Sequence, residues 1–122
     1  MKEIYFFDSY AIMEISKGNS NYIPYINSNV ILTKLNLFEI FYSTLLQKGE
    51  EEAQKLFEDY KEFIIDFSLN DIKEAAKLRF KFRERKLSMV DCIGYILAKK
   101  LGIKFLTGDK EFEDLSNVEF VK

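Results

Sequence analysis

Short apolar runs separated by longer helical segments constrain the fold of this chain more than any other feature of its sequence. The runs are rich in β-branched and aromatic residues, as buried strands are, and they occupy positions 3–7, 30–34, 64–68, 103–107 and 117–121. Strands that alternate with helices, and that are apolar almost throughout, favour a mainly parallel sheet covered on both faces. We therefore predict a three-layer α/β/α domain around a central, mainly parallel sheet of four to five strands.

The segments between these runs have apolar residues at helical spacing. We expect helices over residues 8–18, 35–49, 50–64, 71–86 and 88–102. Asp8 or Ser9 is expected to cap the first of them, Asn70 or Asp71 the fourth, and Ser88 the last. The stretch from Gly18 to residue 29 is rich in asparagine and predicts a loop or a broken helical turn.

Length and composition indicate one domain over residues 1–122, because 48% of the residues are apolar and no second module fits. The lone cysteine, Cys92, excludes an internal disulfide, and the opening MKEIYFF is too short and too acidic for a signal peptide. No apolar stretch reaches the roughly 18 to 20 residues of a membrane span. We expect a cytoplasmic protein with no membrane partner.

The chain contains no histidine, which removes the commonest general base and zinc ligand. Any chemistry must therefore rest on carboxylates. The net charge of −2 and the pI near 5.3 argue against a protein that coats nucleic acid through its overall charge.

Four acids stand out by their positions. Asp8 follows the first predicted strand and Asp109 follows the fourth, so both fall at the carboxyl edge of the sheet, where ligands bind in such folds. Glu39 and Asp91 lie inside helices and are flanked by apolar residues. Taken alone, each acid has an ordinary structural explanation. Asp8 could cap a helix, Glu39 could lie at the solvent-exposed edge of an amphipathic helix, Asp91 could form a capping box, and Asp109 could be a turn residue.

One cause explains all four acids together. Clustered carboxylates cannot all ionise without a compensating charge, and Mg²⁺ or Mn²⁺ prefers oxygen ligands of this kind. Such an ion lowers the pKa of an attacking water and neutralises charge on a phosphodiester. The pattern therefore favours a metal site.

The motifs resemble a known family. FFDSYA at the end of the first strand, LNLFEI in the second helix and LSMVDCIGYILAKKLGIKFLTGDKEF near the end are similar to the PIN-domain ribonucleases, especially the VapC toxins. The last stretch is the most specific, because a Ser-x-x-Asp helix, a glycine, a strand and Thr-x-Asp follow in family order. The resemblance spans nearly the whole chain and implies a PIN-like fold.

The resemblance also implies a function and its residues. Asp8, Glu39, Asp91 and Asp109 match the acidic quartet of the family, with Ser9 and Thr107 in supporting positions beside the metal. The family implies an Mg²⁺- or Mn²⁺-dependent endoribonuclease that acts on RNA as the toxin of a type II toxin-antitoxin system. It also implies a homodimer and inhibition by a small antitoxin protein.

The chain departs from the family pattern at two places. Ile93 and Gly94 stand where relatives often carry alanines, and a glycine inside a helix costs about 1 kcal/mol, so we expect close packing there. Tyr10 occupies a position that is often small or polar. Asp114 is a further acid nearby, which we interpret as a turn residue.

Basic residues near the fourth helix are candidates for RNA contact. They are Lys77, Arg79, Lys81 and Arg83, together with Lys110 after the last acid. A solvated basic face is the alternative, with Lys110 relieving local negative charge. Phe80 and Phe82 are expected to belong to the core rather than to stack on bases.

Two other functions remain open from the sequence. A phosphorylation receiver domain would use Asp8, Asp66, Thr107 and Lys122, but Asp66 lies inside its predicted strand and Lys122 is the last residue. Nor does a receiver explain Glu39 or Asp91. A catalytically silent PIN domain that only binds a partner is the second alternative.

Overall fold

A four-stranded parallel sheet organises the molecule. The computed structural model describes residues 2–122, and its strands are β1 (Ile4–Phe7), β2 (Asn29–Ile31), β3 (Lys104–Thr107) and β4 (Val118–Phe120). They lie in the order β2-β1-β3-β4, and every neighbouring pair is parallel. All four carboxyl ends therefore meet at one edge, which confirms the predicted sheet.

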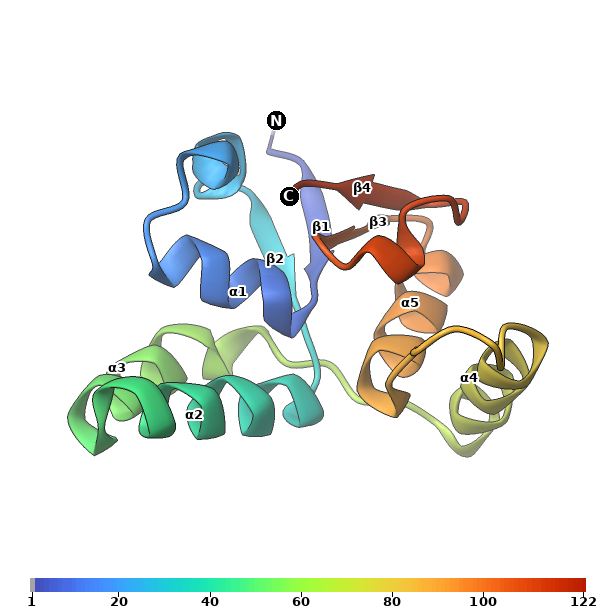
Figure 1. Cartoon of the computed structure of the whole chain (residues 1–122), viewed down its shortest axis with the longest axis horizontal. Coiled ribbons are helices and arrows are strands. Elements are labelled where there is room, and N and C mark those ends of the chain that lie inside the picture. The colour runs from blue at the N-terminus through green and yellow to red at the C-terminus, as the bar shows by residue number, and fades with distance from the viewer. Residues whose placement is uncertain (1) are drawn as a thin grey trace.

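Helices cover both faces of this sheet (Figure 1). The α-helices are α1 (Ser9–Ser16), α2 (Lys34–Lys48), α3 (Glu50–Tyr60), α4 (Leu69–Lys81) and α5 (Met89–Leu101). Short 3₁₀ helices are η1 (Ser20–Tyr25), η2 (Lys61–Phe63) and η3 (Lys110–Phe112). No helix within residues 2–122 combines the length and the apolar character needed to cross a membrane.

Successive strand residues point to opposite faces and build two cores. Phe7 and Leu106 pack with α1, η1 and α2 on one face, whereas Phe6 and Phe105 pack with α4 and α5 on the other. Figure 1 shows the same division, with α1 to α3 on one side of the sheet and α4 and α5 on the other. The predicted three layers are confirmed.

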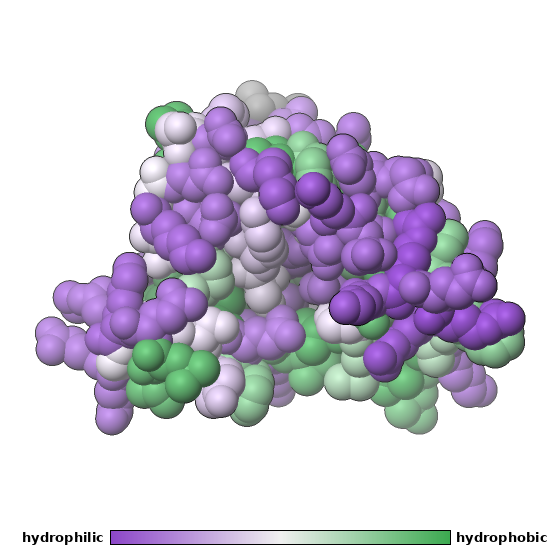
Figure 2. All heavy atoms as spheres, viewed as in Figure 1, coloured by the Kyte–Doolittle hydropathy of each residue, from purple (hydrophilic) through white to green (hydrophobic). Residues whose placement is uncertain are grey.

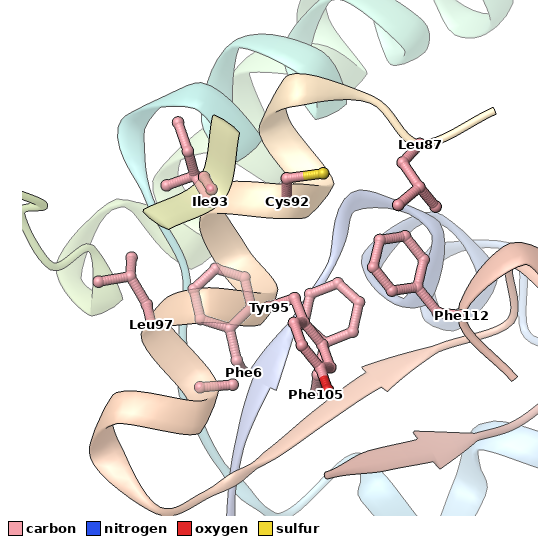
Figure 3. Close-up of a cluster of buried hydrophobic side chains, with 10 residues drawn as sticks. Phe6, Leu87, Cys92, Ile93, Tyr95, Leu97, Phe105 and Phe112 are labelled. Carbon is pink, nitrogen blue, oxygen red and sulfur yellow. The ribbon is translucent and has the colours of Figure 1, made fainter. Parts of the chain in front are cut away.

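The second core is aromatic and tight (Figure 3). The rings of Phe6 and Phe105 stack with centroids 5.8 Å apart, and Tyr95 meets Phe105 edge-on at 5.8 Å. A Cβ on Gly94 would lie 2.6 Å from the Phe6 ring, so α5 approaches the sheet at its glycine. The close packing expected at Gly94 is confirmed.

The predicted strand over residues 64–68 is wrong. Only an isolated bridge joins Ile64 to Leu32, with a hydrogen bond from Ile65 N to Leu32 O of 2.8 Å. The segment turns away after this bridge because Ser68 already caps the next helix. Apolar composition fits a strand here, but the pairing extends no further.

The predicted limits of the fourth helix are also wrong. Ser68, rather than Asn70 or Asp71, is the cap of α4, and Asp71 completes a capping box by accepting a hydrogen bond from Ser68 N at 2.8 Å. The helix ends at Lys81, and residues 82–85 form a turn and a bend instead of a last helical turn. The cap predicted at Ser88 is confirmed for α5.

Candidate active site

A cavity of about 660 Å³ opens at the carboxyl edge of the sheet. All four predicted acids line it, although they come from four different places in the chain. Asp8 follows β1, Glu39 lies in α2, Asp91 lies in the first turn of α5, and Asp109 follows β3. The fold therefore brings together residues separated by up to about a hundred positions.

Asp8 is the most deeply buried of the four, with 1% of its surface exposed. Its Oδ1 accepts a hydrogen bond from Ala11 N at 2.8 Å, so Asp8 is also the cap of α1. Burial, and then the negative charge of Asp91, raise its pKa well above the usual value, while a hydrogen bond from the Thr107 hydroxyl opposes the rise. The carboxylate thus serves as a cap and belongs to the cavity.

A chain of hydrogen bonds holds Glu39. Ser9 Oγ donates to Glu39 Oε1 at 2.5 Å, and Asn36 Nδ2 donates to Ser9 Oγ at 3.1 Å. The Asn36 side-chain oxygen accepts in turn from the backbone N and the hydroxyl of Thr33, at 3.0 and 2.9 Å. The supporting position predicted for Ser9 therefore has a defined contact, directly with a predicted site acid.

Sequence reasoning missed Asn36, which is completely buried and links the start of α2 to Ser9. The sequence does indicate a capping role for Asn36, because it lies three residues after Thr33, at the second position of a capping box. A capping pattern does not reveal that the amide also reaches across to α1, because that contact depends on how the two helices pack.

Asp91 begins α5 together with Ser88. Its backbone N donates to Ser88 Oγ at 3.0 Å, which is the cap expected at Ser88, but the Asp91 side chain does not complete a capping box. Burial, followed by the charges of Glu39 and Asp109, raises the pKa of Asp91 to about 7, against the lowering effect of the Ser88 hydroxyl. The carboxyl is therefore partly protonated at neutral pH when nothing neutralises its surroundings.

Asp109 and Thr107 form a compact turn after β3. The backbone N of Asp109 donates to Thr107 Oγ1 at 3.0 Å, and Asp109 Oδ1 accepts from Glu111 N at 3.0 Å. Asp109 is thus the cap of η3 as well as a wall of the cavity. Thr107 is fully buried and bridges the turn to Asp8, which gives a physical reason for its predicted supporting role.

The donor set of the cavity suits a hard divalent cation. None of the four acids forms a salt bridge within residues 2–122, so buried Asp8 and half-buried Asp91, whose pKa values are raised, face uncompensated negative charge. Carboxylate oxygens are the ligands that Mg²⁺ and Mn²⁺ prefer. No three Asp, Glu or Cys side chains of the described residues form a compact ligand group in this arrangement.

Comparison with known proteins identifies the family. A family model described as PIN domain matches residues 5–118. The chain belongs to the PIN domain family. Among proteins of curated function, no sequence matches this PIN domain significantly.

Solved structures similar to this PIN domain share its fold at low sequence identity. The Mycobacterium tuberculosis toxin VapC20, described as cleaving the sarcin-ricin loop, has a TM-score of 0.80 at 15% identity, over 97% of this chain and 99% of that one. VapBC2 of Rickettsia felis, bound to a promoter DNA fragment, has a TM-score of 0.74 at 19% identity, over 98% of this chain and 99% of that one. A toxin-antitoxin complex from Klebsiella pneumoniae has a TM-score of 0.72 at 17% identity, over 94% of this chain and 95% of that one.

Tyr10 and Gly108 shape one wall of the cavity in this PIN domain. A side chain on Gly108 would overlap the ring of Tyr10, so the bulky residue at position 10 is matched by the missing side chain at position 108. The amino group of Lys122 lies 5.6 Å from the Tyr10 ring centre. Lys17 and Lys110 line the same cavity, and sequence reasoning had singled out only Lys110 as a possible RNA contact.

The other predicted RNA contacts fall into two groups. Lys77 forms a 3.2 Å ion pair with Glu74, and Lys81 lies over the Phe82 ring at 5.4 Å. Arg79 and Arg83 line a second, smaller hollow outside the acidic cavity. Asp66, the acid that a receiver domain would need, is exposed and is not among the residues that line the cavity.

Asp114 has a structural role. Arg85 donates to its two oxygens at 2.7 and 2.9 Å and to the carbonyl oxygen of Glu111 at 2.8 Å. The Arg85 guanidinium lowers the pKa of Asp114. The pair ties the turns after α4 to η3, and thereby helps to hold the segment that carries Asp109, in keeping with the interpretation of Asp114 as a turn residue.

Proposed function

We propose that this PIN domain is a metal-dependent endoribonuclease that hydrolyses RNA phosphodiester bonds as the toxin of a type II toxin-antitoxin system. One observation carries the proposal: acids from four separate elements line a single cavity, and no cation within residues 2–122 pairs with them. The likeness of the fold to toxins of VapBC systems supports the toxin role.

Asp8 and Asp91 are the principal ligands for Mg²⁺ or Mn²⁺ in this proposal, and Glu39 and Asp109 complete the site or hold a second ion. The bound ion neutralises charge on the scissile phosphodiester and lowers the pKa of the attacking water. Burial, and then neighbouring carboxylates, raise the pKa values of both principal ligands, and the charge of a bound cation would offset this rise and favour their ionised forms.

Neighbouring residues keep the acids in place. Asn36 and Ser9 fix the Glu39 carboxylate through two successive hydrogen bonds, and the Thr107 hydroxyl contacts Asp8 while it accepts from Asp109 N. Such contacts around metal ligands orient them and tune the metal affinity. Tyr10 narrows the cavity and restricts which part of an RNA chain reaches the acids.

Cleavage of a panel of structured RNAs tests the proposed activity. Wild type and Asp91→Asn are compared with Mn²⁺ and with a chelator, and Asp66→Asn is the matched control because it removes the charge of an exposed acid outside the cavity. We expect cutting by wild type and by Asp66→Asn with Mn²⁺ only, and none by Asp91→Asn. Equal cutting by wild type and Asp91→Asn, or no cutting of any RNA, contradicts the catalytic assignment.

A silent PIN-type module that only binds a partner is the second candidate. It is favoured by one observation, that the described acids do not yet form a compact ligand group. This candidate predicts that wild type cuts no RNA of the panel under any metal condition while it still binds its protein partner. Cleavage that requires Mn²⁺ and Asp91 excludes it.

We further propose that a small cognate antitoxin binds this cytoplasmic protein and that the protein forms a homodimer. An apolar groove of about 800 Å³ between α2 and α3 supports the antitoxin, because Phe38 and Tyr42 line it while 71% and 54% exposed. We assign this groove to an apolar segment of the antitoxin. Three of the structures with a similar fold are toxin-antitoxin or VapBC complexes.

Copurification with the product of an adjacent short reading frame tests the partner. The substitution Phe38→Asp should abolish the complex and leave RNA cleavage intact, since Phe38 lies outside the acidic cavity. A complex that survives the substitution contradicts the assignment of the groove. Sedimentation velocity of the isolated chain tests the homodimer, and a monomer at micromolar concentration contradicts it.

A further inference from the structure

A second hollow, of about 420 Å³, adjoins the acidic cavity. Its lining consists of Arg79, Arg83, Arg85, Lys86, Leu87 and Ser88. Ser88 also lines the acidic cavity, so the two hollows meet at the start of α5. In Figure 2 the most hydrophilic atoms of this face gather on the side where the connection from α4 to α5 runs.

Most of the positive charge of this hollow is not neutralised. Arg85 is paired with Asp114, but Arg79, Arg83 and Lys86 form no salt bridge with any described residue from 2 to 122. Uncompensated basic side chains beside a site for phosphodiesters attract the phosphates that flank the reacting one.

An exposed aromatic ring lies at the same place. Phe80 is 67% exposed, so the expectation that it belongs to the core is wrong. The guanidinium of Arg83 lies 4.5 Å from its ring centre, and Arg83 also donates to the Phe80 carbonyl oxygen at 3.0 Å. An arginine and an aromatic ring held together in this way are a common platform for unpaired bases.

We propose that this basic hollow and Phe80 together bind single-stranded RNA immediately next to the scissile bond. Arg79 and Lys86 contact phosphates, and one unpaired base stacks on the platform formed by Phe80 and Arg83. The proposal rests on the proposed ribonuclease function and adds the residues that hold an unpaired segment of the substrate beside the scissile bond. It omits Lys77 and Lys81, which line neither hollow.

Fluorescence anisotropy with a fluorescein-labelled, unstructured 12-nucleotide RNA tests the phosphate contacts. The measurement is made with a chelator, so that the RNA is not cut. The variant Arg79→Ala/Lys86→Ala is compared with Lys73→Ala/Lys77→Ala, which removes the same charge from lysines of α4 outside the hollow. Any difference in RNA affinity between the two variants then depends on where the charges are removed and not on the change in net charge.

The size of the effect follows from counterion release. Each phosphate contact to a single strand contributes about 0.7 to the salt slope, so losing two contacts should lower the slope by about 1.4. If the two contacts contribute nothing at 1 M salt, the slope difference makes the RNA affinity of the variant about 25-fold lower than that of wild type at 0.1 M salt. The control variant should lose less than about threefold. Equal losses in the two variants, or no loss in either, overturn the proposal.

Phe80→Ala tests the stacking contact. Loss of one stacked base should weaken binding about fivefold or more, with an unchanged salt slope, because the interaction is not ionic. Sedimentation velocity of the same variant should match wild type. Unchanged RNA affinity, or conversion of a dimer to monomers, overturns the assignment of Phe80 to RNA.

The outcomes separate this proposal from the proposed function. Mn²⁺-dependent cutting by wild type, combined with unchanged binding by Arg79→Ala/Lys86→Ala, overturns the RNA-binding hollow and leaves the nuclease intact. Position-specific loss of binding without any cutting supports the hollow and contradicts the nuclease. Failure of wild type to bind the RNA at 50 mM salt, while a labelled polyglutamate peptide binds through the same side chains, overturns the proposal in favour of an acidic protein segment.

Discussion

Replacing Asp91 by Asn should stabilise the metal-free protein at pH 8 while it abolishes catalysis. The pKa of Asp91 rises from 3.8 in a free chain to about 7 in the fold, so the folded state holds this proton more tightly than the unfolded state. Its contribution to stability is therefore fully present below about pH 4 and is lost as the pH rises towards 7. At pH 8 the folded protein must bear an ionised, poorly neutralised carboxylate.

The magnitude follows from the pKa shift. A rise of about 3 units at about 1.36 kcal/mol each gives an upper limit near 4 kcal/mol for the cost of ionising Asp91 in the fold. Asn removes this cost, but it also removes an acid from the first turn of α5, which is worth about 0.3 to 1 kcal/mol. Coupling to Asp8 and Glu39 reduces the limit further. We expect a net gain of about 2 to 3 kcal/mol at pH 8.

Urea denaturation with a chelator measures this gain. At pH 8 Asp91→Asn should unfold at higher urea than wild type, and the difference should shrink to below about 1 kcal/mol at pH 4, where the wild-type carboxyl is protonated. Asp66→Asn, at an exposed acid, should change stability by less than about 0.5 kcal/mol at either pH. No gain at pH 8, or the same gain at both pH values, refutes the electrostatic description of the cavity.

Four further substitutions test hydrogen bonds and packing by urea denaturation. Asn36→Ala should cost about 2 kcal/mol, since it leaves the buried backbone N and hydroxyl of Thr33 without their acceptor and removes the hydrogen bond to Ser9 Oγ; a neutral result contradicts the hydrogen-bond chain. Gly94→Ala should cost about 1 to 2 kcal/mol because its Cβ would lie 2.6 Å from the Phe6 ring. In the double variant Gly94→Ala/Phe6→Leu the two losses of stability should sum to less than their separate values, because leucine at position 6 relieves the overlap. Strict additivity argues against the contact between position 94 and the Phe6 ring. Tyr22→Phe should cost about 1 kcal/mol by removing the 2.5 Å hydrogen bond to the Val121 carbonyl, and no change contradicts that bond.

The sheet and its acids were predictable because they depend on short, local patterns. Apolar runs with an acid or a threonine at their ends predict buried strands and a polar carboxyl edge, and Asp8 and Asp109 lie at that edge in the fold. Ser88 predicted the start of α5 because a cap and its helix are adjacent in sequence. These features need no knowledge of which elements pack together.

Other features depend on tertiary contacts that a sequence pattern does not contain. Residues 64–68 have the composition of a strand, but only one bridge to Leu32 forms before the chain turns into the cap at Ser68. Asn36 reaches Ser9 only because α1 and α2 pack against each other. Phe80 stands in an apparently alternating stretch, yet α4 places its ring outside the core.

Calorimetric titration of Mn²⁺ into the metal-free protein tests most directly whether the four acids form a cation site. We predict saturable binding to wild type at pH 7.5 and none to Asp8→Asn/Asp91→Asn, whose fold is checked by circular dichroism. Absence of binding to wild type, or equal binding to a folded double variant, would contradict the account.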